Sequence, residues 1–128
     1  MKRGGILNAR LAGELAGLGH TDLVVVCDAG FPVPSGPALV DLAFRFGVPS
    51  FRTVLSGLLE ELVVEGATAA EEIRDSRDAE AVLLDLLPDL GLVTHQELKR
   101  MSANAKLVVR TGEATPFSNA ILRCGVAF

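Results

Sequence analysis

Apolar residues near the start of the chain recur at the spacing of a helix. Leu11, Leu15 and Leu18 fall on one side of the segment NARLAGELAGL, and Asn8 is suited to cap the helix N-terminus. The apolar run LVVVC follows at residues 23–27, and its β-branched residues indicate a short strand that is buried on both faces. The first two elements are therefore predicted to be a helix and an interior strand.

Helical and strand-like patterns alternate along the rest of the chain. A loop rich in proline and glycine, DAGFPVPSGP, separates the first strand from the next segment. The remaining patterns predict, in order, a short strand or turn-like segment at 38–44, a helix at 50–62, a strand at 62–68, helical structure at 69–87 with a break near Asp75, a helix at 94–104, and strands at 106–112 and 120–128. This alternation predicts a single α/β domain over residues 1–128, with three α/β/α layers and a largely parallel central sheet.

The composition of the chain indicates contacts between subunits. The chain is 49% hydrophobic and contains six phenylalanines but no tryptophan or tyrosine, so its apolar surface is mainly aliphatic. Such surface is buried in a parallel sheet or between subunits, and we expect a homo-oligomer. Cys27 and Cys124 lie in apolar, strand-like segments, which favours buried reduced thiols in a cytoplasmic protein over a disulfide.

The charge and hydropathy of the chain argue against two classes of partner. The net charge is −4 and no basic run is present, which argues against nucleic-acid binding. No apolar stretch approaches the length of a membrane span, and the N-terminal MKRGG lacks the long apolar segment that follows in a signal peptide. We therefore expect neither a nucleic acid nor a membrane among the partners.

Polar residues stand at both ends of the strand at 23–27. Asp28 follows the strand directly, where ligands bind in open α/β sheets, although an aspartate at such a position also commonly caps a turn. His20 precedes the strand, and its imidazole is suited to moving protons near neutral pH, but a lone histidine is more commonly a surface loop residue. The pattern alone leaves both alternatives open for each residue.

A second histidine and a polar loop are further candidates. Thr94 and Glu97 form a capping box that places His95 in the first turn of a helix. There the helix dipole favours a neutral imidazole. Such a ring either hydrogen-bonds to a ligand or is simply an exposed residue at the helix start. The polar segment 110–120 is longer than a tight hairpin needs, and it either carries ligand-binding side chains or merely connects two strands. No nucleotide-binding glycine motif is present, and Cys27 and Asp28, which are adjacent at the end of the first strand, point to opposite faces. We therefore expect no cofactor and no metal.

Several segments together resemble one protein family. They are KRGGILN, LGHTDLVVVCDAGFPVP, VDLAFRFGVPSF, AAEEI, THQELK, VVRTGEATPFSNAIL and GVAF, and they occur in the family's order over nearly the whole chain. On these segments the chain resembles the D-ribose pyranases, which are relatives of the L-fucose mutarotases. The resemblance implies a cofactor-free isomerase that interconverts the pyranose and furanose forms of free D-ribose. GHTD and DAGFP are the ribose-like versions of two segments, and a fucose mutarotase-like activity or a non-catalytic sugar-binding protein are the alternatives.

The resemblance also implies roles for individual residues and a form of assembly. It makes His20 the proton donor in general acid–base catalysis and makes Asp28 and His95 ligands of the sugar. The family assembles into a decamer of two pentameric rings with sites at subunit interfaces, and the same homo-oligomer is expected here. His20 and Asp28 lie about 25 Å apart if the strand between them is extended, at roughly 3.3 Å per residue. Either the loops fold back, or two subunits contribute to one site.

One segment of the implied site departs from the family pattern. Where relatives read Tyr-Ala-Asn, this chain reads Phe117-Ser118-Asn119. The resemblance makes all three residues contacts of the sugar, with Phe117 packing against its apolar face. Phe117 has no hydroxyl to donate, and Ser118 is a candidate to supply one instead.

Overall fold

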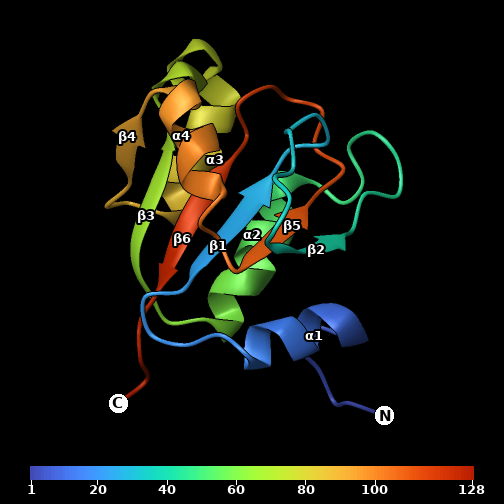
Figure 1. The fold of residues 1–128 in the computed structure, drawn as a ribbon. Helices are drawn as coiled ribbons and strands as arrows, with labels where there is room; N and C mark the ends of the chain where they lie inside the picture. The colour runs from blue at the N-terminus through green and yellow to red at the C-terminus, as the bar shows by residue number, and fades with distance from the viewer.

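The computed structural model describes all of residues 1–128 and contains one six-stranded sheet with helices on both faces (Figure 1). The strands are β1 (Leu23–Cys27), β2 (Ala38–Asp41), β3 (Val64–Ala70), β4 (Gly91–Val93), β5 (Leu107–Arg110) and β6 (Ala120–Cys124). The helices are α1 (Ala9–Ala16), α2 (Phe51–Glu61), α3 (Arg77–Leu86) and α4 (His95–Ser102), and a 3₁₀ turn, η1 (Glu71–Asp75), precedes α3. The predicted α/β class is confirmed.

Strand β1 lies inside the sheet, which has the order β2-β5-β1-β6-β3-β4. The pairs β2–β5, β5–β1 and β3–β4 are parallel, whereas β6 runs antiparallel to both of its neighbours. Val25 pairs with Val108 of β5 and with Ile121 of β6, and residues 24–27 have no exposed surface. The predicted largely parallel sheet is confirmed, and its buried β1 fixes where the loops at its two ends begin.

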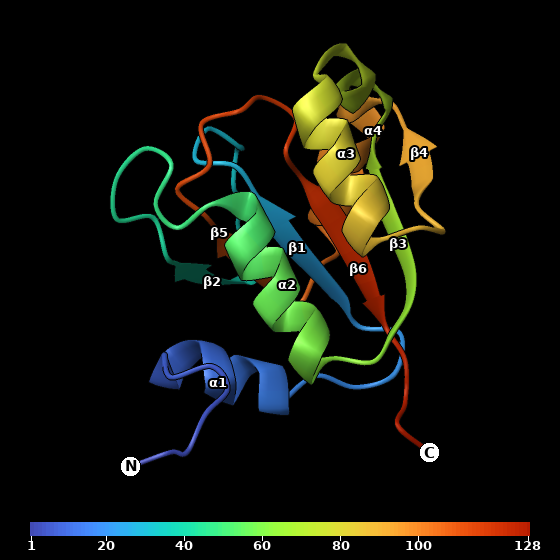
Figure 2. The ribbon, with the colours of Figure 1, turned by 180° about the vertical axis from the view of Figure 1, so that it is seen from behind.

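Successive residues of β1 face different helical layers. Val24 belongs to a core cluster with residues of α1, α2 and α3, including the fully buried Leu55. Val25 belongs to a second cluster, which includes Leu98 of α4. Figure 1 shows α4 in front of the sheet, and Figure 2, from behind, shows α2 and α3 covering the opposite face. This strand is therefore apolar throughout because both of its faces are covered, and the three-layer prediction is confirmed.

The boundaries of several elements differ from the prediction. Strand β4 was not predicted, because its three residues carry no pattern of their own and it is defined by pairing with β3. The last two strands end at Arg110 and Cys124, earlier than expected, and β3 extends to Ala70. The predicted break in the helical segment 69–87 is confirmed, since η1 and α3 are separated at Ser76.

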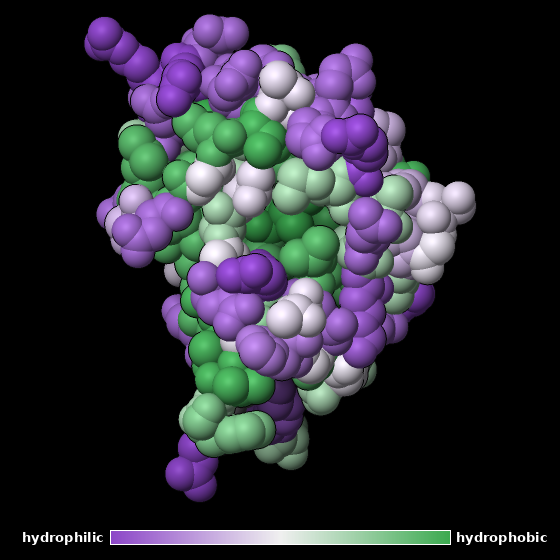
Figure 3. All heavy atoms as spheres, turned by 60° about the vertical axis from the view of Figure 1, so that its left-hand side comes forward, coloured by the Kyte–Doolittle hydropathy of each residue, from purple (hydrophilic) through white to green (hydrophobic).

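Apolar side chains remain open to solvent on two parts of the surface. Phe44 and Phe46 are 78% and 85% exposed on the loop after β2, which projects from the molecule (Figure 1). In Figure 3, where the side of β3 and β4 comes forward, apolar side chains gather in a hollow with polar side chains around it. A cavity of about 370 Å³ on this part of the molecule is lined by residues that include Met101 and Ile121. No helix combines the length and the apolar character needed to cross a membrane.

Candidate functional site

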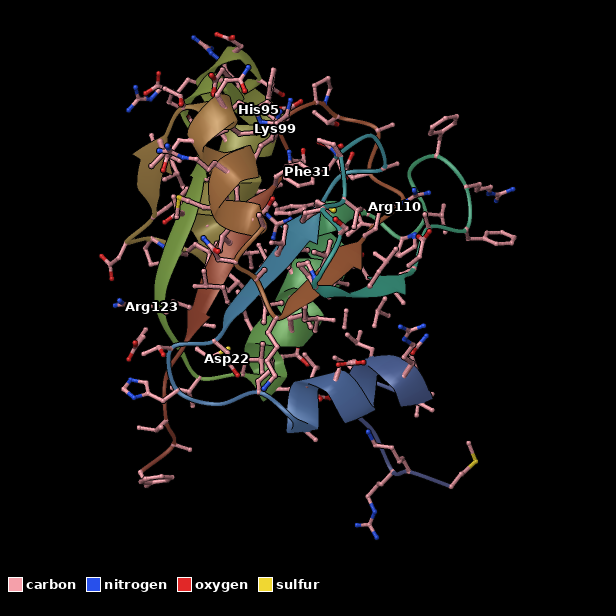
Figure 4. All side chains as sticks on the ribbon, in the orientation of Figure 1. Asp22, Phe31, His95, Lys99, Arg110 and Arg123 are labelled. Atoms are coloured by element: carbon pink, nitrogen blue, oxygen red, sulfur yellow. The ribbon has the colours of Figure 1, made fainter.

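A cavity of about 390 Å³ opens beyond the carboxyl end of β1. Its walls come from the loop after β1, the first turns of α4 and the loop between β5 and β6, and Phe46 of the projecting loop adds to the rim. Figure 4 labels Phe31, His95 and Lys99 at this end of the sheet. The lining side chains that can hydrogen-bond are those of Asp28, His95, Lys99, Glu113 and Thr115. This is the position at which open α/β sheets bind ligands.

Asn119 holds Asp28 through both ends of its side-chain amide. The Asn119 Nδ2 group donates to Asp28 Oδ2 at 2.9 Å, and Asn119 Oδ1 accepts from the Asp28 backbone N–H at 2.8 Å. The other carboxylate oxygen accepts from the Gly30 N–H at 2.9 Å. Asn119 is completely buried and does not line the cavity, whereas Asp28 does. Asn119 therefore orients the carboxylate that the cavity presents.

Burial controls the protonation of the two groups at the end of β1. It raises the pKa of the Asp28 carboxyl above its ordinary value, although the hydrogen bonds from Asn119 and Gly30 act in the opposite direction. Burial, with the neighbouring Asp28 charge, also raises the pKa of the Cys27 thiol to about 12. A buried thiol of this kind is inert as a nucleophile. The chemistry available at this point belongs to the carboxylate.

The N-terminus of α4 fixes the position of His95. Thr94 Oγ1 accepts from the Glu97 N–H at 3.1 Å, so the predicted N-cap is confirmed. The two carboxylate oxygens of Glu72 accept a hydrogen bond from the backbone N–H of His95, at 2.9 and 3.1 Å. This hydrogen bond lowers the pKa of Glu72. An acidic side chain from η1 thus satisfies a free N–H group of the helix and holds His95 at the cavity.

The imidazole of His95 lies between two phenyl rings. It packs edge-on against Phe31 and Phe117, with ring centroids 6.1 and 5.1 Å away. Its Nδ1 atom is buried and has no hydrogen-bond partner. Buried polar atoms are nearly always paired, so this nitrogen lacks the partner that such an atom normally has.

A tight turn separates the roles of the three consecutive residues that the sequence singled out. Phe117 has a φ of 64°, in the left-handed region, and its carbonyl accepts from the Asn119 N–H at 2.8 Å. Phe117 lines the cavity, whereas Ser118 is 3% exposed and Asn119 is completely buried. The turn therefore presents the phenyl ring to the cavity and directs the next two residues into the protein.

Glu113 is a lining residue that the sequence did not reveal. Its carboxylate accepts from the Phe51 N–H at the start of α2 and from the N–H and hydroxyl of Thr115, at 3.0 to 3.1 Å. Its carbonyl accepts from the Ala29 N–H at 2.9 Å. Burial acts to raise the pKa of Glu113, but these hydrogen bonds outweigh it and the pKa is lowered. Glu113 thus ties the two loops of the cavity to α2, through partners distant in sequence.

Comparison with known proteins identifies the family of this chain. A model of the RbsD / FucU transport protein family matches residues 1–127. The chain belongs to this family. It is 65% identical to D-ribose pyranase 1 of Rubrobacter xylanophilus and 64% identical to the D-ribose pyranase of Streptomyces coelicolor, in each case over the full length of both chains. The predicted resemblance is confirmed at the level of the family.

Solved structures of other proteins share the fold of this chain. The structure of Bacillus subtilis RbsD complexed with D-ribose superposes with a TM-score of 0.94, at 44% identity and with full coverage of both chains. The fucose mutarotase of Streptococcus pneumoniae in complex with L-fucose has a TM-score of 0.83 at 18% identity, with 95% of each chain covered. At this identity, the similarity to the fucose mutarotase shows that the two chains have the same fold.

In this member of the family, His20 lies away from the cavity, at the opposite end of β1. Its Nε2 atom is 3.1 Å from Glu65 Oε2, and the adjacent Thr21 N–H donates to the carbonyl of Cys124 at 2.8 Å. Figure 4 labels Asp22 and Arg123 at this end of the sheet. The loop before β1 does not fold back. One chain therefore brings Asp28, His95 and Phe117 together at the cavity but leaves His20 apart.

Proposed function

We propose that this chain is a D-ribose pyranase, which interconverts the pyranose and furanose forms of free D-ribose by opening and closing the ring. The observation that carries the proposal is the cavity in which the Asp28 carboxylate and the unpartnered His95 Nδ1 stand beside aromatic rings. A volume of about 390 Å³ suits a small ligand. The full-length similarity to D-ribose pyranases, and to an RbsD complexed with D-ribose, supports the same substrate.

Within the cavity, we assign the sugar contacts to three residues. The Asp28 carboxylate accepts from sugar hydroxyls, His95 Nδ1 pairs with a further hydroxyl, and the Phe117 ring packs against the apolar face of the sugar. Ser118 and Asn119 were expected to contact the sugar as well. Because both are buried, we assign neither a direct contact, and we propose that Asn119 acts by orienting Asp28.

The proton donor of the proposed reaction comes from a second copy of the chain. His20 is the residue to which the family resemblance assigns this role, and it lies at the far end of β1 from its own cavity. A homo-oligomer that places His20 of one subunit at the cavity of another completes the site. The exposed Phe44 and Phe46, the latter on the cavity rim, support such a contact, and the decamer of two pentameric rings is its expected form. We also propose a cytoplasmic location, in keeping with two buried free thiols.

The reaction couples proton transfers to the breaking of one C–O bond and the formation of another. His20, as imidazolium, gives a proton to the ring oxygen while the bond between C1 and that oxygen breaks, and the bonding pair goes to the ring oxygen. The proton of the C1 hydroxyl passes to water, which leaves the open-chain aldehyde. Attack by a different hydroxyl on C1, with the reverse transfers, closes the other ring form. General acid–base catalysis of this kind contributes about 10²–10⁴-fold, which suffices for a reaction that proceeds slowly in water.

Saturation-transfer NMR of D-ribose tests this proposal. We expect the wild-type protein to accelerate pyranose–furanose exchange over buffer, and His20→Ala to remove most of the acceleration at an equal folded fraction. Faster exchange of L-fucose anomers than of ribose forms would favour the mutarotase alternative. Ribose binding without any accelerated exchange would contradict the proposal and indicate a sugar-binding protein.

A further inference from the structure

One carboxylate joins His20 to Arg123. Glu65 Oε2 lies 3.1 Å from His20 Nε2, and Glu65 Oε1 lies 3.2 Å from Arg123 Nε. The three side chains come from three segments: the loop before β1, strand β3 and strand β6. They are partly exposed, with 53%, 33% and 55% of the His20, Glu65 and Arg123 side chains accessible to solvent.

A strand irregularity places Glu65 in this position. In the pairing of β3 with β6, Val64 is opposite Cys124 and Gly66 is opposite Arg123, so Glu65 is an extra residue between two paired positions. A β-bulge of this kind changes the direction of a side chain and occurs frequently near active sites. The backbone is therefore built to bring Glu65 to His20 and Arg123 together.

The other charged groups near His20 are already paired or uncharged. Asp22, on the same loop, accepts from Lys106 Nζ at 2.9 Å and from the Gly19 N–H at 2.7 Å. Burial raises the pKa of the Cys124 thiol, which is neutral at pH 7. Glu65 is thus the acid that hydrogen-bonds to the imidazole.

We propose that Glu65 is a positioning residue for His20. Its carboxylate binds Nε2 of the imidazole, which leaves Nδ1 as the nitrogen that passes the proton to the sugar. This inference rests on the proposed function, in which His20 is the proton donor. In a histidine, the partner of one ring nitrogen decides the role of the other. The Glu65 carboxylate stabilises the imidazolium before transfer and accepts from Nε2–H after Nδ1 has lost its proton. Arg123 shares the carboxylate and weakens its effect on the imidazole.

The rate of ribose exchange at a fixed, neutral pH tests this arrangement with variants of opposite sign. Glu65→Gln removes the negative charge that faces the imidazole, so we expect exchange to slow by about two- to fivefold, the scale of a partly exposed ion pair. Arg123→Gln frees the carboxylate for His20 and is expected to leave exchange at least as fast as in the wild type. The control is Asp85→Asn, which breaks the exposed Arg52–Asp85 pair between α2 and α3 and is expected to leave the rate unchanged.

Two further measurements separate this inference from the proposed function. Glu65→Gln made in the His20→Ala background is expected to have no additional effect on exchange, because Glu65 acts through His20. In ¹⁵N spectra of the two histidines, Glu65→Gln is expected to change the Nε2 signal of His20 and to leave His95 as it is. If His20→Ala slows exchange while Glu65→Gln and Asp85→Asn exchange ribose at the same rate, the inference alone is overturned. If His20→Ala exchanges ribose like the wild type, the proposed role of His20 is overturned as well.

Discussion

Asn119 shows how a residue near the cavity acts without touching it. Both ends of its amide are bound to Asp28, and neither is exposed. The sequence identified Asn119 as a candidate, but its spacing from Asp28 gave no sign that the two are partners. They are 91 positions apart and meet only because β6 pairs with β1. The role of such a residue follows from the sheet rather than from the local pattern.

We predict that Asn119→Ala destabilises the fold and disables the cavity. The change leaves the Asp28 N–H and one carboxylate oxygen, Oδ2, without their buried partner, which costs about 2–3 kcal/mol in the free energy of unfolding. Urea denaturation followed by far-UV circular dichroism measures this cost, since the chain has no tryptophan or tyrosine for fluorescence. Ser118→Ala is the matched control, because Ser118 is also buried, and it is expected to cost less than about 1 kcal/mol. Equal losses in the two variants would contradict the role assigned to Asn119.

Phe117 carries a second prediction at this scale. Its ring lines the cavity, and a para-hydroxyl would give it the donor found at this position in the family pattern. We expect Phe117→Tyr to tighten ribose binding by about 1 kcal/mol, the value of one net hydrogen bond, as measured by titration calorimetry. Phe117→Leu, which removes the ring, is expected to weaken binding. If Phe117→Tyr binds ribose no more tightly than the wild type does, no sugar hydroxyl lies within reach of this ring position.

At the scale of elements, the sequence pattern predicted those helices and strands that depend on interactions between residues close in sequence. The apolar run of β1 and the Thr94 N-cap of α4 were both recognisable, because a buried strand and a helix start each leave a signal within a few residues. Strand β4 was not recognisable, since its three residues owe their conformation to β3. The anchoring of two loops by Glu113 also escaped prediction, because Phe51 is 62 positions away.

The junction of η1 and α4 gives a prediction about pH. The hydrogen bond from the His95 N–H lowers the pKa of Glu72 below its ordinary value of 4.5. A lowered pKa means that the ionised carboxylate stabilises the fold above about pH 4.5, and this contribution is lost as pH falls through the native-state value. We therefore expect wild type to lose more stability than Glu72→Gln between neutral and acidic pH in urea titrations. The control is Glu71→Gln on the same turn, and parallel curves for wild type and Glu72→Gln would contradict the prediction.

At the scale of the whole molecule, the cavity and the proposed proton donor lie at opposite ends of one strand. The sequence raised two solutions to this separation, and the loop before β1 does not fold back, so a site shared between subunits is the one we propose. The copy number and symmetry of such an assembly depend on contacts between chains, and a single chain's pattern carries little information about them. The aliphatic composition and the exposed Phe44 and Phe46 are consistent with surfaces that another copy covers.

Mixing two inactive variants tests the shared site most directly. His20→Ala and Asp28→Asn subunits are each expected to be inactive alone, and they are refolded together in equal amounts. An interface that joins His20 of one variant to Asp28 of the other then contains both functional residues, and random assembly forms about a quarter of all sites in this way. We predict that the mixture recovers about that fraction of the wild-type rate of pyranose–furanose exchange, measured by saturation-transfer NMR. A mixture as inactive as either variant alone would contradict a ribose site built from two subunits.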